Sequence, residues 1–497
     1  MQLEIRTENG LDAVELSKGE NLLDVLTRLG YDVNAVCGGN GSCYKCKVRV
    51  IKPFIKPVPR ELTALSAEEI NRGIRLACGV TLEEDTEIEI LRNEKMQVLA
   101  SASVKEHKTE KKGKVHAAVD IGTTTVVVAL IDEKAAVIGS IGEKNKQAAF
   151  GADVIARIKA VVNGQLEQLQ SVIIKQINAM LKELTVLHDV GEITDITIAG
   201  NTAMLHLFFG KDCSGLGHFP YEADFLASQT ANGLVLGFNF DVPVHSLPCI
   251  ASFAGADLTA GIVSQWRETK KYTLLIDLGT NAEIALFNGS KVFVSSAAAG
   301  PAFEGASIKQ GMGAVPGAIC SYELVNGNGR VRTIGNKLPV GICGSGLIDI
   351  VAELLKNNLL EDTGFLRTGK SFELCEEVSI FAQDIRELQL AKAAIAAAID
   401  MLIITAGLTP EDIDRVLISG GFGSYINPGN AALIGLFPAE LREKTAAAGN
   451  SSLAGCIQCA AFSQKKALAE KIAANAKYLD LASSVEFAQR YVDHMMF

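Results

Sequence analysis

The chain has 497 residues, of which 48% are hydrophobic and 21% charged, and its formal net charge is −10. This length suits two to four globular domains, and the acidic balance with only 6% aromatic residues argues against nucleic acid as a partner. The first twenty residues lack a basic segment followed by an apolar run, and no stretch reaches about 18 uncharged apolar residues, so we expect neither a secretory signal nor a membrane helix. Eleven cysteines in such a chain indicate a reducing cytoplasm.

Residues 1–92 carry the pattern of a small α+β domain. Residues 2–6 and 47–51 alternate apolar and polar side chains as strands do, 11–17 suggest a further strand, and 21–29 have helical spacing. Residues 93–114 follow as a linker, because 101–114 are polar, rich in lysine and without period.

Four cysteines of this domain form a candidate metal site. Cys37, Cys43 and Cys46 share one glycine-rich loop, and Cys78 follows later in the chain. Four thiolates can hold a two-iron cluster, and a zinc ion is the alternative. Zinc sites usually show two closely spaced cysteine pairs, whereas here only Cys43 and Cys46 form one, so a cluster is favoured.

The spacing of these cysteines and the segment RLACGV around Cys78 resemble the plant- and vertebrate-type ferredoxins. The resemblance covers residues 1–92 and implies a ferredoxin-like (β-grasp) domain. It also implies one [2Fe–2S] cluster on Cys37, Cys43, Cys46 and Cys78. The other seven cysteines are expected to be buried small hydrophobes. They are Cys213, Cys249, Cys320, Cys343, Cys375, Cys456 and Cys459.

From Val115 onward, short apolar strands alternate with helical stretches such as 152–186 and 386–406, which indicates an α/β fold. Residues 117–132 (AAVDIGTTTVVVALID) and 273–287 (TLLIDLGTNAEIALF) share one pattern of strand, Asp-x-Gly-Thr turn and second strand. This echo predicts two related lobes, a first lobe at 115–270 and a second at 271–497.

The two turns carry residues suited to a nucleotide. Asp120 and Asp277 end apolar strands, where a carboxylate can hold Mg²⁺ through water. Gly122 and Gly279 allow a tight turn, after which amides and hydroxyls can face phosphate oxygens. The hydroxyls are those of Thr123, Thr124, Thr125 and Thr280. A third segment, VLISGGFG (416–423), places Gly420 and Gly421 after a strand, where adenosine could lie against bare backbone. Each turn alone could equally be a plain β-turn.

In this order the three motifs resemble the actin, sugar-kinase and heat-shock-chaperone superfamily, whose two ribonuclease-H-like lobes close over ATP. The resemblance implies Asp120 in the first phosphate motif, Asp277 in the second, and Gly420 and Gly421 in the adenosine motif. It gives Asp120 and Asp277 the catalytic role. A homodimer is common in this superfamily.

A ferredoxin domain joined to such an ATPase resembles the reductive activators of corrinoid-dependent methyltransferases. Long blocks carry this resemblance, among them FGADVIARI (150–158), AGNTAMLHL (199–207), AAAGPAFEGASIKQGM (297–312) and SGGFGSYINPGNAALIGLFP (419–438). It implies ATP-dependent, one-electron reduction of a corrinoid protein from cobalt(II) to cobalt(I), with the electron delivered through the [2Fe–2S] cluster. The implied partners are that corrinoid protein and an external low-potential electron donor. No cysteine follows Cys459, so the two C-terminal [4Fe–4S] sites of some activators are not expected.

Several alternatives stay open. The chain could donate electrons to a different metalloenzyme, act as a small-molecule kinase with a redox-sensing ferredoxin domain, or serve as a non-enzymatic scaffold. His206 could ligate cobalt, or it could be a structural histidine of an apolar helix. Glu304 could contact Mg²⁺, position water or take part in buried hydrogen bonding.

Overall fold

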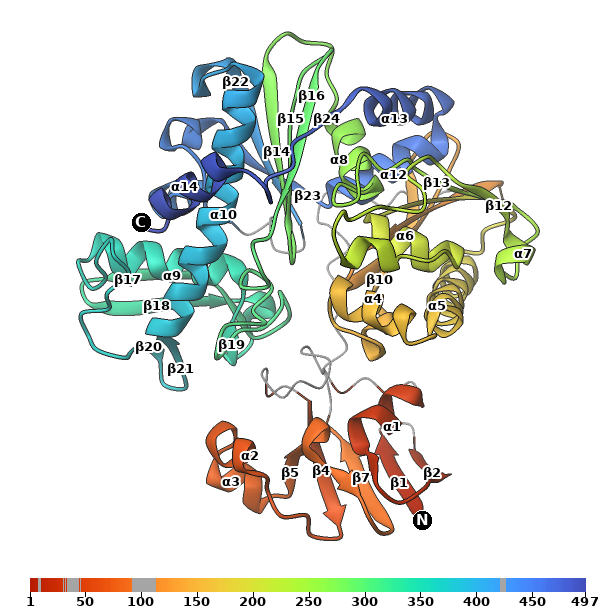
Figure 1. Cartoon of the computed structure of the whole chain (residues 1–497), viewed down its shortest axis with the longest axis vertical. Helices are drawn as coiled ribbons and strands as arrows, with labels where there is room; N and C mark the ends of the chain where they lie inside the picture. Colours follow the sequence, from red (N-terminus) through yellow and green to blue (C-terminus); the bar gives the residue numbers. More distant parts are fainter. Residues whose placement is uncertain are drawn as a thin grey trace.

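The computed structural model describes residues 1–7, 10–29, 31, 33, 44, 46–91, 113–420 and 426–497. They form a small N-terminal domain at one end of the long axis and two larger lobes beyond it (Figure 1). Predicted residues Cys37, Cys43 and Gly421, and most of the expected linker, lie outside the described residues.

The N-terminal domain is a mixed five-stranded sheet, in the order β2-β1-β7-β4-β5, with helix α1 packed on it. The first strand β1 runs parallel to β7 and antiparallel to β2, which is a β-grasp arrangement. Its core contains alternate residues of β1, Leu3 and Ile5, and the apolar face of α1. The predicted strands and helix are confirmed. The elements are β1 (Gln2–Thr7), β2 (Gly10–Glu15), β3 (Glu20–Asn21), α1 (Leu22–Arg28), β4 (Lys47–Lys52), α2 (Pro59–Ala64), α3 (Ala67–Asn71), β5 (Ile74–Leu76), β6 (Thr81–Leu82) and β7 (Thr86–Ile90).

The first lobe has a six-stranded sheet in the order β10-β9-β8-β11-β13-β12. The predicted helical stretch 152–186 is divided in two, because Gly164 has a φ of +82° and ends the first helix. The elements are β8 (Val115–Ile121), β9 (Thr125–Ile131), β10 (Val137–Lys144), α4 (Val154–Val162), α5 (Leu166–Leu187), β11 (Ile193–Gly200), α6 (Thr202–Phe209), β12 (Thr230–Asn232), α7 (Gly233–Leu236), β13 (Pro243–Ser246) and α8 (Ala256–Gln265).

The second lobe repeats this plan in the strand order β23-β22-β14-β15-β16-β24. In both lobes three consecutive strands form an antiparallel meander, β8-β9-β10 or β14-β15-β16. The first strand of each meander also pairs with a parallel strand, β8 with β11 and β14 with β22. The duplication predicted from the two Asp-x-Gly-Thr turns is therefore present in the fold. The elements are β14 (Tyr272–Leu278), β15 (Ala282–Phe287), β16 (Val292–Ala297), β17 (Ala318–Val325), β18 (Asn328–Thr333), β19 (Gly341–Ile342), α9 (Gly344–Lys356), β20 (Ser371–Cys375), β21 (Val378–Phe381), α10 (Ala382–Ala406), β22 (Ile413–Ser419), α11 (Pro428–Leu433), β23 (Thr445–Gly449), β24 (Lys477–Tyr478) and α14 (Val485–Asp493).

Two helices lie between the two sheets. Helix α12 (Ser451–Ala461) packs against α8, and one core cluster joins α12 residues such as Leu453 to Val119 of the first sheet and Leu275 of the second (Figure 1). Gly455 of α12 lies so close to the Ala260 carbonyl of α8 that a side chain there would collide with it. The chain thus returns to the first lobe through α12 and α13 (Ser463–Asn475) after β23, and then adds the last strand of the second sheet, β24.

Helix α10 is the one helix among the described residues that is long and apolar enough to cross a membrane. However, 78% of its apolar stretch is buried inside the second lobe, and core helices commonly meet the same criterion. It also carries the buried charged residues Asp384 and Lys392.

Candidate functional site

The two Asp-x-Gly-Thr turns face one cleft between the lobes. Each turn is closed by a backbone hydrogen bond, from Gly122 N to the Thr125 carbonyl (2.9 Å) and from Gly279 N to the Asn281 carbonyl (2.9 Å). Thr123 and Thr124 line the cleft from the first lobe, and Thr280 lines it from the second. Thr125 does not belong to this lining, and its part is to close the first turn.

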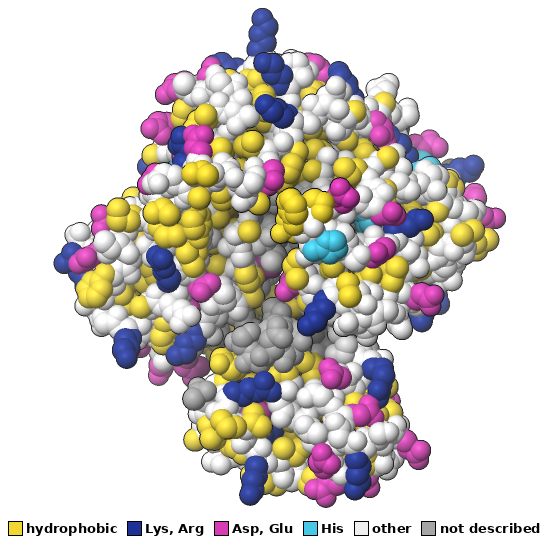
Figure 2. Space-filling view, viewed as in Figure 1, with side chains coloured by type: hydrophobic (Ala, Val, Ile, Leu, Met, Phe, Trp, Pro, Cys, Tyr) yellow, Lys and Arg dark blue, Asp and Glu magenta, His cyan; other side chains and the backbone are white. Residues whose placement is uncertain are grey.

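The cleft has a volume of about 1260 Å³ and largely apolar walls. Ile155, Tyr221 and Phe253 belong to the first-lobe wall, and Leu338 and Val340 belong to the second. Figure 2 shows hydrophobic side chains gathered along this hollow. A cleft with polar loops and apolar walls matches the usual build of a ligand site.

Five carboxyl groups gather beside the turns, and each keeps a partly accessible edge: Asp120, Asp257, Asp277, Glu283 and Glu304. Burial, and then the negative charge of Asp277, raises the pKa of Asp257 to about 7. Burial, and then the charge of Asp120, raises the pKa of Asp277 to about 6. So many like charges in one place suit a divalent cation, and Mg²⁺ prefers carboxylate and water oxygens. Among the described residues, no three acidic, histidine or cysteine side chains are placed to ligate one metal ion together, so these carboxyl groups fit the expected Mg²⁺ only as partners that hold it through water.

Sequence reasoning missed Asp257 and Glu283. Glu283 lies directly opposite Asp277 in the β14–β15 pair. Like charges opposite each other destabilise a sheet, so an acidic residue six positions after Asp277 in the predicted hairpin was a usable signal. Asp257 lies in the first turn of α8, and its neighbours in sequence gave no comparable signal.

Two asparagines hold the first turn from two different helices. Asn201, the N-cap of α6, donates from Nδ2 to Thr123 Oγ1 (3.0 Å). Asn450, the N-cap of α12, donates from Nδ2 to Asp120 Oδ2 (2.8 Å), and Ser452 Oγ donates to Asp120 Oδ1 (2.7 Å). Both oxygens of Asp120 are thus already hydrogen-bonded in this state.

The sequence also contains a repeated tetrapeptide at this pair of asparagines. Residues 199–202 read Ala-Gly-Asn-Thr and residues 448–451 read Ala-Gly-Asn-Ser, each at a strand-to-helix turn. Asn, Thr and Ser are frequent residues at helix N-termini, so a repeated tetrapeptide of this kind marks two equivalent helix starts.

The buried guanidinium of Arg157 also holds the backbone of the first turn. Arg157 of α4 is fully buried, and its Nη2 donates to the Thr123 carbonyl (2.6 Å) while its Nε donates to the Gly151 carbonyl (2.9 Å). Burial lowers the pKa of the Arg157 guanidinium to about 9. Asn145 adds a hydrogen bond from Nδ2 to the Gly122 carbonyl (2.9 Å). These bonds fix the loop's backbone before any ligand binds.

The predicted adenosine motif lies beside the second turn. Strand β22 runs parallel to β14, so Ser419 is the neighbour of Asp277. Gly420 follows with a φ of +108°, and a Cβ there would collide with the Leu278 carbonyl. Only glycine satisfies both constraints, and the position keeps the backbone bare next to Gly279.

In the N-terminal domain, the structure brings two of the four predicted cluster cysteines together. Ala77, next to Cys78, donates its backbone N–H to the Cys46 carbonyl (2.8 Å). Both cysteines are nearly inaccessible, with residue exposures of 1% for Cys46 and 9% for Cys78. Arg60 Nη2 donates to the Cys78 carbonyl (2.7 Å). Two buried thiols on adjacent backbone segments fit an iron–sulfur ligand set, of which Cys37 and Cys43 lie outside the described residues.

Three family models match successive parts of the chain. They are a 2Fe-2S iron-sulfur cluster binding domain at residues 7–83, the RACo middle region at 115–267 and the C-terminal domain of RACo, the ASKHA domain, at 271–497. A solved structure described as a reductive activator for corrinoid, iron-sulfur protein is 28% identical, with a TM-score of 0.70 over 100% of this chain and 98% of that chain. The chain belongs to the reductive activators of corrinoid proteins.

Named relatives of this activator agree with that family. The corrinoid activation enzyme RamQ of Eubacterium limosum is 27% identical over 98% of both chains. The [Co(II) methylated amine-specific corrinoid protein] reductase of Methanosarcina barkeri is 28% identical over 61% of this chain and 62% of its own. The fold expected from the sequence, a ferredoxin-like domain followed by an actin-type ATPase, is confirmed.

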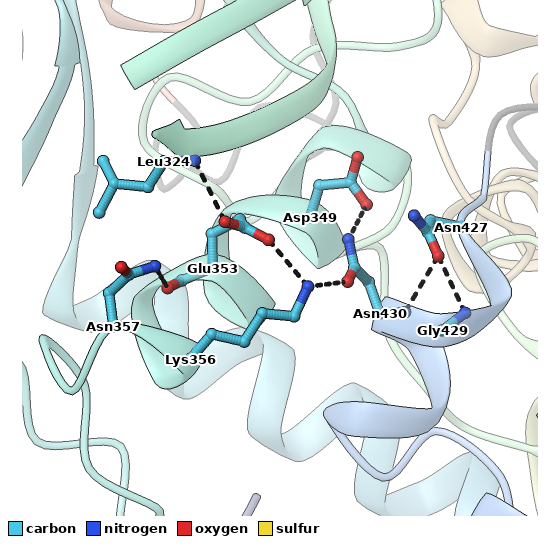
Figure 3. Close-up of polar contacts among 8 residues, drawn as sticks. All are labelled: Leu324, Asp349, Glu353, Lys356, Asn357, Asn427, Gly429 and Asn430. Atoms are coloured by element: carbon cyan, nitrogen blue, oxygen red, sulfur yellow. Dashed lines mark hydrogen bonds and ion pairs between the residues drawn. The ribbon is translucent and has the colours of Figure 1, made fainter. Parts of the chain in front are cut away.

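The activator anchors the helix after its adenosine motif through a polar network in which Asp349, Glu353 and Asn430 are buried (Figure 3). Asn430 of α11 donates from Nδ2 to Asp349 Oδ1 (2.7 Å) and accepts from Lys356 Nζ (2.7 Å). Lys356 also pairs with Glu353 (2.8 Å), whose other oxygen accepts from the Leu324 backbone N–H (3.1 Å). The network joins α9 to α11.

Replacing Asn430 by alanine should lower the free energy of unfolding by about 1–3 kcal/mol, because the buried Asp349 carboxyl loses the strongest of the donors that offset its burial. Urea unfolding followed by circular dichroism measures this change. Asn357→Ala is the matched control: Asn357 is exposed at the end of α9, and its loss should have less than half the effect. Equal effects would show that the network does not matter to stability.

The carboxyl cluster predicts how stability depends on pH. Asp257 and Asp277 bind a proton up to pH 6–7 in the folded state but only to about pH 4 when unfolded. Between these values the folded state holds more protons, so metal-free protein loses stability as pH rises from about 4 to 7. We expect a Tm roughly 2–4 °C lower at pH 7.5 than at pH 5.5, recovered by Mg²⁺. A Tm that rises with pH, or an Asp257→Asn variant with unchanged pH dependence, would contradict this.

The remaining cysteines and His206 are structural in this activator. Six of the other seven cysteines are buried and Cys375 is half-buried, so the prediction of small buried hydrophobes holds except at Cys375. His206 is fully buried and stacks on Phe225 at 4.2 Å. Its Nδ1 donates to the Thr202 carbonyl (2.7 Å) and its Nε2 accepts from the Phe225 N–H (3.3 Å). Both ring nitrogens are used, so the structural alternative holds.

Proposed function

We propose that this activator uses ATP to drive one electron onto the cobalt of a corrinoid protein, converting inactive cobalt(II) to cobalt(I). Cys37, Cys43, Cys46 and Cys78 hold a [2Fe–2S] cluster in the N-terminal domain, and Mg-ATP binds between the lobes. The protein acts in the cytoplasm. The names of its relatives, which refer to corrinoid activation and corrinoid-protein reduction, support this choice of substrate.

The proposal rests above all on the convergence of two phosphate-type turns on one cleft. Thr124 and Thr280 come from different lobes, yet both lie within hydrogen-bond reach of the same carboxyl group. With ATP in this cleft, Asp120 and Asp277 hold Mg²⁺ through water, and the threonine hydroxyls with the turn amides bind phosphate oxygens. Gly420 leaves its backbone bare for adenosine, and Gly421 is the second residue expected to contact it.

ATP is required because the cobalt(II)/cobalt(I) couple of the corrinoid protein lies at a lower potential than the cluster, so that electron transfer from cluster to cobalt is uphill. A [2Fe–2S] cluster held by these cysteines would supply electrons one at a time, at about −400 mV for plant-type clusters. Each 59 mV of deficit corresponds to about 1.4 kcal/mol for one electron. Overall, cobalt(II) gains one electron from an external low-potential donor, while ATP and water become ADP and phosphate. Because a ligand shifts an equilibrium only through its differential affinity, the ATP and ADP states of the cleft must bind the corrinoid protein differently.

An anaerobic visible-absorption assay tests the proposal. Purified activator, a reductant and a cobalt(II) corrinoid protein are mixed with Mg-ATP, with Mg-ADP or without nucleotide. We expect the cobalt(I) band to grow only with Mg-ATP, accompanied by ADP formation. Phosphorylation of a small molecule would instead support the kinase alternative. Failure with several corrinoid proteins, despite a reducible cluster and ATP hydrolysis, would point to another electron acceptor.

A further inference from the structure

We propose that Glu304 senses the terminal phosphate of the bound nucleotide. When that phosphate is absent, the Glu304 carboxylate accepts hydrogen bonds from both phosphate-type turns and so links them. When ATP binds, its terminal phosphate replaces the carboxylate as the acceptor, and the link is broken. This inference rests on the proposed function, since it assumes that ATP binds between the two turns. It adds a named residue through which the cleft distinguishes ATP from ADP.

The geometry of Glu304 is that of a bridge between the lobes. Its Oε1 accepts a hydrogen bond from Thr124 Oγ1 (3.3 Å), and its Oε2 accepts one from Thr280 Oγ1 (2.7 Å). Thr124 belongs to the turn between β8 and β9, and Thr280 to the turn between β14 and β15. A single carboxylate thus uses both of its oxygens to join the two turns across the cleft.

A phosphate group cannot share these donors with Glu304. A threonine hydroxyl has one hydrogen, so each donates one strong hydrogen bond, either to the carboxylate or to a phosphate oxygen. The carboxylate and the phosphate are also both acceptors and both anionic, so they repel each other at hydrogen-bond distance. Occupation of the space between the turns by phosphate therefore requires Glu304 to leave.

The position of Glu304 points to the terminal phosphate in particular. The adenosine motif reaches Gly420 beside Leu278, whereas Glu304 lines the interlobe cleft together with Thr123, Thr124 and Thr280. Among the described residues, Gly420 is not part of that lining. A nucleotide that enters from the adenosine end thus extends its last phosphate toward Glu304. ADP, which lacks this phosphate, leaves the bridge in place.

The chain segment that follows Glu304 connects it to the second-lobe wall of the cleft. The segment that carries it continues along the second-lobe wall, where Ala306, Met312 and Val315 line the cleft. Gly317, at the end of this segment, accepts a backbone hydrogen bond from Val340, which is 62% exposed on the same wall. Movement of Glu304 is therefore transmitted to an exposed apolar wall, the kind of surface that a partner protein contacts.

The test compares nucleotide affinities by isothermal titration calorimetry, with Mg-ADP and with the Mg²⁺ complex of a non-hydrolysable ATP analogue. Glu304→Gln removes the charge while keeping the shape. We expect it to bind the ATP analogue about tenfold more tightly, which is about 1.4 kcal/mol, and ADP within about twofold of the wild type. Glu304→Asp keeps the charge but is too short to bridge, and should give a smaller gain for the analogue alone.

Three results separate the possible outcomes. Weaker or unchanged binding of the ATP analogue by Glu304→Gln would overturn the inference and instead favour a Mg²⁺-binding or water-positioning role. Equal gains for both nucleotides would overturn it as well, because no terminal phosphate would then be sensed. If the wild type binds neither nucleotide, the ATP requirement of the proposed function fails, and this inference with it. Should Glu304→Gln not fold, the Glu304→Asp comparison decides between the same outcomes.

Discussion

Asp277→Ala is expected to reduce ATP hydrolysis about 100-fold or more while leaving the iron–sulfur absorbance unchanged. Asp277 is the last residue but one of β14 and lies among the five carboxyl groups beside the two turns. Its removal takes away a Mg²⁺-binding group where the charge of the transferred phosphate must be neutralised. Phosphate release under saturating Mg-ATP measures the rate.

The matched control for Asp277→Ala is Asp414→Ala, which removes an exposed aspartate from the neighbouring strand β22. Asp414→Ala should hydrolyse ATP at the wild-type rate. If Asp277→Ala also hydrolysed ATP normally, Asp277 would have no part in catalysis, and the second turn would be only structural.

Cys46→Ser is expected to abolish the native [2Fe–2S] absorbance and to lower corrinoid reduction to the background rate. Cys46 is buried directly before β4, and its carbonyl accepts a hydrogen bond from the segment that carries Cys78, so a serine there removes a thiolate that surrounding residues cannot replace. ATP hydrolysis should stay within about twofold of the wild type, because the nucleotide site is formed by other domains.

Cys375→Ser is the control for this substitution. Cys375 is half-buried at the end of β20 in the second lobe, and its loss should leave both the cluster and electron transfer intact. A native cluster spectrum in Cys46→Ser would exclude Cys46 as a ligand. Loss of the cluster with unchanged corrinoid reduction would mean that electrons reach cobalt by another route.

The sequence predicted the parts of this fold that depend on local pattern. Alternation in 2–6 and 47–51 predicted two strands of the N-terminal sheet, and the repeated Asp-x-Gly-Thr hairpins predicted the duplicated lobes, because strand period and turn chemistry depend on neighbouring residues. The β-grasp arrangement itself was implied by the resemblance to ferredoxins. Thr123, Thr124 and Thr280 line the cleft, and Asp120 and Asp277 lie near each other beside the turns. Their roles, and those of Cys37, Cys43 and Gly421 outside the described residues, stay predictions.

The site residues that the sequence alone did not predict depend on distant contacts. Asn450 reaches Asp120 across 330 positions of the chain, because α12 returns from the second sheet to the first lobe. Arg157 is one of two cations, with Lys159, in an amphipathic helix, where a solvated surface position is the ordinary expectation. Only the repeated Ala-Gly-Asn-Thr/Ser turn could have identified one of these contacts beforehand.

A single-turnover mixing experiment tests the central claim most directly. Activator with its cluster reduced, and free of excess reductant, is mixed anaerobically with an equal amount of cobalt(II) corrinoid protein, and both chromophores are followed in one trace. With Mg-ATP, we predict that cluster oxidation and cobalt(I) formation proceed at the same rate and in equal amounts, and that neither proceeds with Mg-ADP. Equal cobalt(I) formation without ATP, or cobalt(I) formation while the cluster stays reduced, would contradict ATP-driven electron transfer from this cluster.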